Sequence, residues 1–432
     1  MSRRVVVTGM GWITPLGHDI DGVWQRLLRG ESGVASTMLF DARTFPTTFS
    51  AEVKNFRLAD FLNSQDAERH KSASRQAGFA LAAASLAWRN AGLDRTDRLD
   101  RSAIGVYLGG GEGPIDFQNF AQCAIGAWNY EGGNLDTRQW AAIAAERLSA
   151  VVELEQDPNM AASHMACLFQ VEGPNLNTLT ACAASTQAIG EATEIIRRGD
   201  AEAMISGGCH SMIHPLGVTG FNRLTALSTR NDSCITASRP FDRTRDGFVL
   251  GEGAGMLILE EYEHARRRGA TIHAEITGYG STADAFRITD IHETGRGAIA
   301  AMSNALKGAG VKPGDVHYIS AHGTGTVEND KIETLAIRSV FGEHARKTPI
   351  SSVKSMLGHL IAAAGAVELI TCILAIRDGK LPPTINYQNP DANCDLDYIP
   401  NTARDAHVTR CLSNSFGFGG QNDTLIVEKP RG

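Results

Sequence analysis

Hydrophobic and polar positions change their period within one stretch of the chain, Asn175 to Gly199. Residues 175–180 alternate polar and apolar side chains, as a short strand does. From Ala183 onward the apolar residues recur at helical spacing, and Gly199 provides a natural helix stop. The pattern predicts a sharp strand-to-helix junction that carries Cys182. Because a helix N-terminus favours negative charge, we expect a stabilised thiolate there, with a small buried thiol in a packed turn as the structural alternative.

The same order of elements occurs twice along the chain. A strand at Val5–Val7 ends in Thr-Gly-Met-Gly, and a second strand from Ala274 ends in Thr-Gly-Tyr-Gly. Later, a strand at 349–354 and a buried helix at 360–377 repeat the strand, Cys182 and helix order. This repeat predicts a duplicated α/β fold built from βαβ units. We expect one half at 1–262, with an inserted cap near 115–160, and a second half at 263–432.

Individual residues argue against a dinucleotide-binding turn near the N-terminus and against a membrane span in the second half. The glycines at 9 and 11 suggest a dinucleotide-binding turn, but Thr14 replaces the third glycine and Pro15 disfavours a helix start. The longest apolar stretch, Leu360–Ile376, carries Glu368 in its middle. It therefore predicts a buried core helix and not a membrane span.

Composition restricts the class of protein further. The chain has 432 residues, 43% hydrophobic and 21% charged, which is typical of a globular protein with two or three domains or two large halves. The net charge of −7 argues against a nucleic-acid binder and means that an acidic partner needs a local basic patch. The eight cysteines lack a C-x-x-C pair and zinc-like spacing. Together with an N-terminus that lacks a signal-peptide pattern, this predicts a cytoplasmic protein without disulfides.

Two histidines and a lysine stand at positions where α/β proteins build sites. His322 follows a predicted strand at 316–321, and His359 closes the segment that begins at Lys354. With Cys182 they suit thioester chemistry, in which a thiolate attacks and neutral imidazoles stabilise an enolate. A Cys-His-Asp hydrolase is the competing hypothesis, but it needs only one histidine.

These motifs resemble the β-ketoacyl-acyl carrier protein synthases, the elongating condensing enzymes of thiolase-like fold. The resemblance covers nearly the whole chain. It rests on Thr180-Ala181-Cys182, Arg239-Pro240-Phe241-Asp242, Gly251-Glu252-Gly253, Ala321-His322-Gly323-Thr324, Lys354-Ser355 with Gly358-His359, and Asn414-Ser415-Phe416-Gly417-Phe418-Gly419-Gly420. It implies duplicated halves in a layered αβαβα arrangement.

The resemblance also implies roles for single residues. Cys182 would accept the acyl chain, while His322 and His359 would hold the malonyl thioester and promote its decarboxylation. The backbone N–H groups of Cys182 and Phe416 would form the oxyanion hole, and Phe416 would act as a gate. Lys354 would anchor the histidines. The supporting carboxylates would be Glu333, Glu368 and Asp330, although a plain surface charge is an equal alternative for Glu333. Neither a cofactor nor a metal is implied.

The implied partner is an acyl carrier protein loaded with an acyl or malonyl group. Arg69 and Lys71 match a docking region of the family loosely, and plain solvated charges are the alternative. The chain would form a homodimer, or a heterodimer with a chain-length-factor-like subunit. Chain-length factors lack the nucleophile, whereas this chain retains Cys182. Nucleic acid and membrane are not expected partners.

The pathway and two other functions remain open at this point. Asn329-Asp330 followed by Glu333-Thr334, and Gln421 after the glycines, resemble the ketosynthase subunit of type II polyketide systems more than fatty-acid elongation enzymes. We therefore expect polyketide or polyene biosynthesis, with fatty-acid elongation as the alternative. A biosynthetic thiolase would need a second catalytic cysteine, for which Cys411 is the nearest candidate. A non-catalytic scaffold subunit is the third hypothesis.

Overall fold

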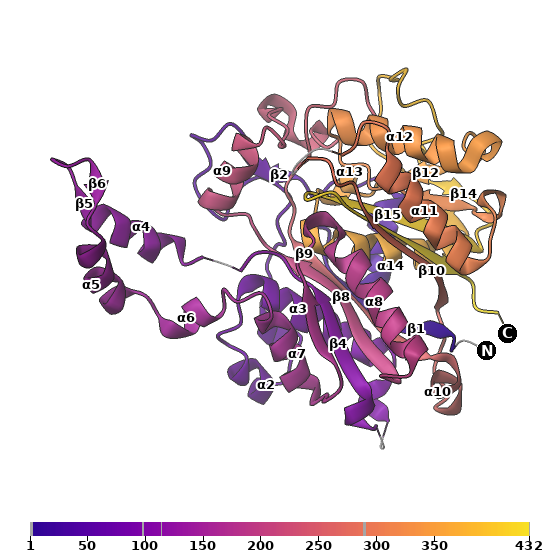
Figure 1. Cartoon of the computed structure of the whole chain (residues 1–432), viewed down its shortest axis with the longest axis horizontal. Coiled ribbons are helices and arrows are strands. Elements are labelled where there is room, and N and C mark those ends of the chain that lie inside the picture. The colour runs from indigo at the N-terminus through magenta and orange to yellow at the C-terminus, as the bar shows by residue number, and fades with distance from the viewer. Residues whose placement is uncertain (1–2, 97–98, 114, 288–290, 432) are drawn as a thin grey trace.

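The computed structural model describes residues 3–96, 99–113, 115–287 and 291–431, and a ten-stranded sheet runs through the molecule (Figure 1). Its first five strands come from the first half of the chain. From the edge inward they are β7 (Asn175–Thr178), β4 (Ile104–Gly109), β8 (Ala203–His210), β9 (Gly253–Glu261) and β1 (Val5–Ile13). β4 lies parallel to β7 and β8, and β9 is antiparallel to β8 and β1.

The other five strands repeat this order from the second half. They are β10 (Ala274–Ala283), β16 (Gln421–Glu428), β15 (Arg410–Gly417), β11 (Tyr318–Ser320) and β12 (Ile350–Ser351). Here β11 lies parallel to β12 and β15, and β16 is antiparallel to β15 and β10. β1 and β10 pair antiparallel and join the two sets. The predicted duplication is therefore confirmed at the level of sheet topology.

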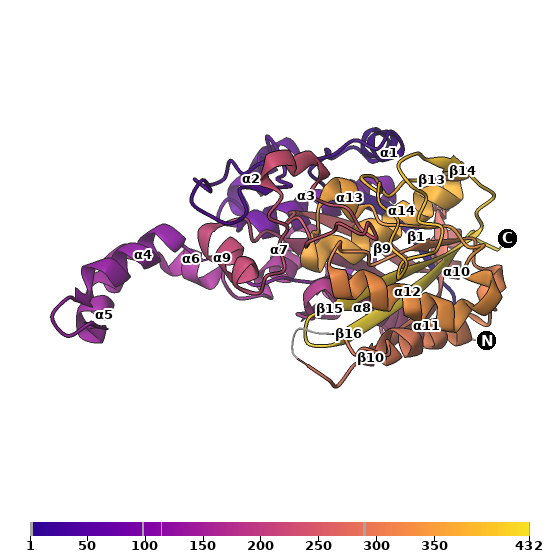
Figure 2. The ribbon, with the colours of Figure 1, turned by 90° about the horizontal axis from the view of Figure 1, so that it is seen from above.

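Helices form three layers around these strands. α3 (Arg75–Asn90) covers β1 and β9, and α11 (Arg296–Ala309) covers β10 and β16. Between them, α8 (Ala184–Arg198) and α14 (Ala364–Asp378) pack against each other, α8 on β4 and β8 and α14 on β15 and β9. All but the last two residues of α14 are buried, including Glu368, so the predicted core helix is confirmed. This is the expected αβαβα arrangement (Figures 1 and 2).

The two Thr-Gly-x-Gly segments are sites of close helix packing. A Cβ atom on Gly11 would lie 2.2 Å from the carbonyl oxygen of Ala83 in α3, and one on Gly280 would lie 2.1 Å from that of Ala301 in α11. β1 continues beyond its glycines to Ile13 with antiparallel partners on both sides. The glycines therefore allow helix–sheet contact and do not form a phosphate-binding turn.

The segment expected to form a cap projects away from the body instead. It contains α4 (Phe117–Gly126), the ribbon β5 (Trp128–Asn129) and β6 (Asn134–Leu135), α5 (Thr137–Arg147) and α6 (Ala150–Leu154). Figures 1 and 2 show these elements extending outward as an arm, so they do not cover the body of this chain, and a role as a cap stays a prediction. We call residues 117–154 the arm. Its return to the body is α7 (Met160–Phe169), which packs on α3 and β4.

The remaining elements connect these layers. They are α1 (Ile20–Leu28), α2 (Ser64–Arg69), α9 (Pro215–Arg223), α10 (Tyr262–Arg267), α12 (Val327–Phe341), α13 (Lys354–Leu357) and the two-stranded ribbons β2 (Ala35–Ser36) with β3 (Phe49–Ser50) and β13 (Lys380–Leu381) with β14 (Arg404–Asp405). The expected boundary between residues 262 and 263 falls at the start of α10 and stays a prediction. Within the described ranges, every helix is too short or too polar to cross a bilayer.

Candidate active site

Cys182 lies in a short 3-10 turn, Ala181–Ala183, between β7 and α8. Ala181 has a positive φ of 48°, and the matching turn of the second half has Ile361 at 44°. The strained turn therefore belongs to the duplicated fold and not to the cysteine alone. Burial raises the pKa of the Cys182 thiol to about 12, against the opposing influence of Lys354. Desolvation outweighs Lys354 and the backbone N–H groups, which favours the buried-thiol alternative over a resting thiolate.

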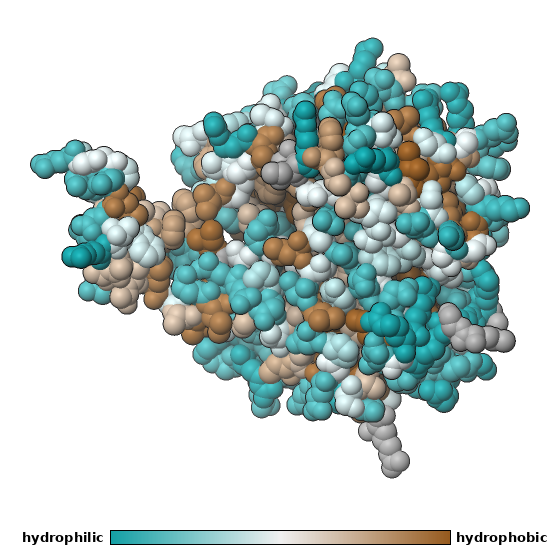
Figure 3. Space-filling view, viewed as in Figure 1, coloured by the Kyte–Doolittle hydropathy of each residue, from teal (hydrophilic) through white to brown (hydrophobic). Residues whose placement is uncertain are grey.

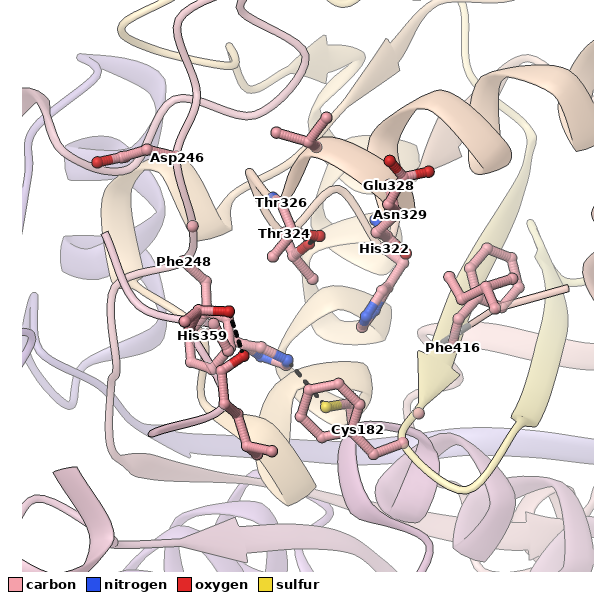
Figure 4. A pocket seen from close by; sticks show the side chains of 18 residues that line it. Cys182, Asp246, Phe248, His322, Thr324, Thr326, Glu328, Asn329, His359 and Phe416 are labelled. Atoms are coloured by element: carbon pink, nitrogen blue, oxygen red, sulfur yellow. Dashed lines mark hydrogen bonds between the residues drawn. The ribbon is translucent and has the colours of Figure 1, made fainter. Parts of the chain in front are cut away.

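His359 contacts the cysteine directly. Its Nε2 lies 3.0 Å from the Cys182 sulfur, and its Nδ1 accepts a hydrogen bond from the backbone N–H of Ile361. Since Nδ1 is an acceptor, the neutral ring carries its proton on Nε2 and donates it to the sulfur (Figure 4). Burial, followed by the charge of Lys354, holds the pKa of His359 well below its ordinary value.

His322 presents a second neutral imidazole from the loop after β11. The ring centroids of His322 and His359 lie 5.4 Å apart at 80°. Lys354 lies behind this ring, where its Nζ is 3.5 Å from Nδ1 and donates to the His322 carbonyl oxygen at 2.7 Å. Burial and then Lys354 lower the pKa of His322 well below its ordinary value. The contact with Lys354 favours a proton on Nε2, which makes His322 a second N–H donor at the site.

Lys354 is held in place by an acidic partner in the core. It forms an ion pair with Glu368 of α14, and both side chains are buried. Burial raises the pKa of Glu368 to about 7, although Lys354 opposes this shift. The sequence predicted that Lys354 ends a strand, but Lys354 is instead the first residue of the helix α13. The helix directs the amine toward the histidine loop.

Glu333 and Asp330 hold the loops beside the histidines. Glu333 accepts the backbone N–H groups of His322 and Gly323, both at 2.8 Å, and it is fully buried. The surface-charge alternative for Glu333 is therefore wrong. Asp330 accepts the backbone N–H of Phe241 at 2.7 Å and lies 3.5 Å from Arg245. These carboxylates position backbone; they do not line the reactive cluster.

The two phenylalanines of the final glycine loop take different positions. Phe416 lies in β15, opposite Asn422 of β16, and its ring packs at 5.7 Å from that of His322. The backbone N–H of Phe418 faces the Cys182 sulfur, where it opposes the rise of the thiol pKa that burial causes. This contact favours Phe418 as an oxyanion donor, and the expected role of Phe416 stays a prediction. The sequence could not distinguish Phe416 from Phe418, because both belong to a repeated Phe-Gly pair. The pairing of β15 with β16 decides which backbone N–H is available to the cysteine.

These residues line one cavity of about 310 Å³. Cys182, His322, His359 and Phe416 lie at its inner end, and Thr324 and Asn329 lie farther from the sulfur (Figure 4). Gly417, Phe418 and Val327 also line it. Phe248 packs edge-on against His359 with ring centroids 5.1 Å apart. The cavity has both apolar and polar lining residues, and it reaches a thiol and two N–H donors.

Cys182, His322 and His359 could also be considered as metal ligands, and they form the group of such side chains found among the described residues. One ligand atom from each of Cys182, His322 and His359 lies within 4.8 Å of the others. A metal on Nε2 of His359 would move its proton to Nδ1, where it would face the N–H of Ile361. This hydrogen bond favours an acyl site over a metal site, and the absence of a metal stays a prediction.

Arg69 and Lys71 do not reach this cavity. Both are exposed at the end of α2, and Lys71 pairs with Glu68. Their role in docking stays a prediction.

Comparison with protein families gives two matches that together span most of the chain. The model described as beta-ketoacyl synthase, N-terminal domain, matches residues 2–265, and the C-terminal domain model matches residues 273–388. The chain belongs to the β-ketoacyl synthase family. It is therefore an acyl-transferring condensing enzyme of the elongating type.

Curated relatives agree over the full length of this β-ketoacyl synthase. It is 42% identical over 427 residues to the 3-oxoacyl-[acyl-carrier-protein] synthase 2 of Coxiella burnetii, which covers 99% of both chains. It is 44% identical over 427 residues to the enzyme of that name from a Synechocystis species, covering 99% of this chain and 98% of the relative.

Solved structures show the same fold. One is a type II polyketide ketosynthase in complex with its acyl carrier protein and bound to the hexaketide, with a TM-score of 0.87, 35% identity and full coverage of both chains. The ishigamide ketosynthase/chain length factor matches with a TM-score of 0.87, 32% identity and full coverage of both. A beta-ketoacyl synthase from Burkholderia phymatum matches at 0.87, with 34% identity over 99% of this chain and 100% of the other.

Proposed function

We propose that this enzyme extends an acyl thioester by decarboxylative condensation with a malonyl thioester, and that an acyl carrier protein delivers both. One observation carries the proposal: a thiol and two neutral imidazole N–H donors converge within 4.8 Å at the end of one cavity. A nucleophile and two donors are what acyl capture and enolate formation each require.

In the first step the Cys182 sulfur attacks the carbonyl carbon of the acyl thioester. The Nε2–H of His359 and the amide of Phe418 stabilise the thiolate that forms as the thiol gives up its proton. A new carbon–sulfur bond forms on Cys182, the old one breaks, and the proton leaves with the departing carrier thiol. The backbone N–H groups of Cys182 and Phe418 are the proposed donors to the oxyanion.

In the second step the malonyl thioester replaces the departed carrier. Its carbonyl oxygen accepts the N–H groups of His322 and His359, which stabilise the enolate left when carbon dioxide departs. The enolate carbon attacks the acyl carbonyl, and the bond to Cys182 breaks. The products are a 3-oxoacyl thioester and the Cys182 thiolate, which takes up a proton from water to restore the thiol. Low histidine pKa values suit this role, because a neutral ring donates a hydrogen bond without protonating the enolate carbon.

Replacing the nucleophile tests the proposal. Cys182→Ala is expected to lose both the acyl-enzyme and the 3-oxoacyl product, by on the order of a thousandfold or more, because the covalent step has no substitute. Intact-protein mass spectrometry after incubation with acyl-carrier protein, followed by product analysis with malonyl-carrier protein, measures both. Condensation that survives in Cys182→Ala would rule the proposal out.

Cys411→Ala is the matched control and also tests the thiolase alternative. Cys411 is buried in β15 and its thiol contacts the carbonyl oxygen of Cys372 at 3.6 Å. It does not line the cavity, so we expect condensation within about threefold of the unmodified enzyme. A selective loss of acetyl-CoA thiolysis in this variant would instead support a thiolase.

The pathway is a separate proposal. The curated relatives at 41–44% identity are named 3-oxoacyl-[acyl-carrier-protein] synthase 2, which favours general acyl elongation. The type II polyketide ketosynthase among the solved neighbours shares 35%. Elongation is therefore the function we propose, and the polyketide preference suggested by Asn329-Asp330 and Gln421 stays a prediction.

We also propose that the enzyme works as a dimer, with a second copy or with a chain-length-factor-like subunit. The arm exposes Ile125 at 67% and Leu154 at 57%, and the residue directly after the outer strand β7, Leu179, is 51% exposed. Figure 3 shows hydrophobic side chains along the arm. Apolar surface on a projecting segment favours a protein partner.

A further inference from the structure

His210 ends strand β8 as a buried imidazole that the proposed mechanism does not use. Its side chain has no exposed surface, and neither ring nitrogen has a hydrogen-bond partner among the residues that the structure describes. An unpaired buried polar group costs about 1–3 kcal/mol. Native proteins keep such groups paired with protein, ligand or ordered water. His210 therefore has a free donor and a free acceptor nitrogen that a ligand atom or an ordered water can pair with.

His210 lies two strands away from the strand that leads to the nucleophile Cys182. Gly208 of β8 lies opposite Gly109 of β4, and β4 in turn pairs with β7, which leads to Cys182. The run Gly109–Gly111 thus lies between the strand ends that carry His210 and Cys182. A Cβ atom on Gly111 would lie 2.0 Å from Nδ1 of His210, and one on Gly109 would lie 2.4 Å from Ala184 at the start of α8. The imidazole packs on the same glycine run that touches the Cys182 helix.

Two other polar groups lie around this run. Glu112 directly follows it, and His214 precedes α9, where its Nδ1 accepts the backbone N–H of Gly217 at 3.2 Å. Burial, with His214 adding to it, lowers the pKa of His210 to about 3, so this ring is neutral with one donor and one acceptor nitrogen. Burial raises the pKa of Cys182, and the Glu112 carboxylate adds to this rise. Glu112 therefore acts electrostatically on the nucleophile.

Apolar side chains complete the surroundings of the cysteine. Ile213 and Val218, from the segment that follows β8, belong to the same buried cluster as Cys182, and Phe221 packs against it. The sulfur therefore lies beside apolar side chains on this side, and His210 is the polar group with unused hydrogen-bonding capacity near them.

We propose that His210 binds an oxygen atom on the acyl chain carried by Cys182. This inference rests on the proposed function, because it takes Cys182 to hold the acyl chain. A neutral His210 donates to an oxo oxygen, or accepts from a hydroxyl group through its other nitrogen. The acyl chains that the enzyme prefers are then oxygenated chains and not plain alkyl chains.

Acylation of Cys182 by three pantetheine thioesters tests this specificity. Octanoyl, 3-oxooctanoyl and 5-oxooctanoyl esters are compared by the rate at which each adds its mass to the intact enzyme. The better oxo ester is expected to react about tenfold faster than octanoyl. In His210→Leu the ratio of the oxo rate to the octanoyl rate is expected to fall to within about twofold. The amide of His210→Asn retains most of the preference. His407→Leu, an exposed histidine, is the matched control.

The outcomes separate this inference from the proposed function. Equal rates for the oxo and plain esters in the unmodified enzyme would overturn the role of His210. This test does not depend on whether a variant folds. An equal loss for all esters in a folded His210→Leu, judged by its melting temperature, indicates a structural role and also overturns it. A failure of Cys182 to accept any of the three esters overturns the proposed function itself.

Discussion

Asp423 is a buried carboxyl group on strand β16 that accepts the hydroxyl of Tyr279 at 3.0 Å. Its other oxygen has no partner in the described part of the chain. Burial raises the pKa of Asp423 to about 7 from an ordinary value of 3.8. A raised pKa in the folded state stabilises the protein below the unfolded pKa, and this stability is lost as the pH rises through the folded pKa.

The expected result is a loss of roughly 2–3 kcal/mol in the free energy of unfolding between pH 5 and pH 8 from this group alone. Asp423→Asn removes the titration and is expected to be the more stable protein at pH 8. Urea unfolding of both proteins at the two pH values measures this difference. Asp232→Asn, at an exposed position, should reproduce the original pH dependence. A wild-type stability that is flat over this range contradicts the assignment.

Residue types near the site were predictable because their chemistry is carried by the side chain alone. Cys182, His322 and His359 were identified from their places after predicted strands, and Lys354 from the segment that His359 closes. The structure brings all four together. The protonation state of Cys182 was not predictable, because it depends on burial. Phe418 was missed for a similar reason, since only the pairing of β15 with β16 shows which amide is free.

At the scale of elements, the paired glycines decide how closely helix and sheet approach. Gly280→Ala would place a methyl group 2.1 Å from the backbone oxygen of Ala301, which must shift together with α11. We expect a loss of about 1–3 kcal/mol, or more, in the free energy of unfolding. Thermal and denaturant unfolding measure this loss.

Gly220→Ala is the matched control for this prediction. Gly220 lies within α9, and a Cβ atom there would meet no atom within 4 Å. The change should be neutral or stabilising by up to about 1 kcal/mol, because alanine favours the helix. Similar losses at Gly220 and Gly280 would show that close packing is not the cause.

The elements themselves were largely predictable from hydrophobic period, and the arm was not. Buried strands such as β1 and β9 and the apolar helix α14 can be predicted from their apolar composition. The arm has irregular patterning with exposed aromatic residues such as Phe120 and Trp128. Such a pattern is compatible with a cap or with a projection, and only packing against the body distinguishes them.

At the scale of the whole molecule, the arm is the surface on which we expect a partner. Ile125→Glu places a charge on its apolar face and should weaken the dimer about tenfold or more. Analytical ultracentrifugation across a concentration series measures the dissociation constant. Met38→Glu is the control, since Met38 is 82% exposed but lies outside the arm and β7.

A protein that is monomeric alone and becomes a heterodimer on co-expression with a ketosynthase-like subunit would support the chain-length-factor alternative. An unchanged dimer constant in Ile125→Glu would place the contact elsewhere on the molecule.

The sequence by itself determined the duplicated α/β architecture, the family and the chemistry-bearing residues, because periodicity, repeat order and side-chain type are local properties. The tertiary structure decided which of these residues meet. It set the tautomer of His359 through the amide of Ile361, kept the Cys182 thiol protonated by burial, and left His210 without a partner beside the glycine run. Each of these depends on desolvation and on contacts between segments far apart in the chain, which no local pattern records.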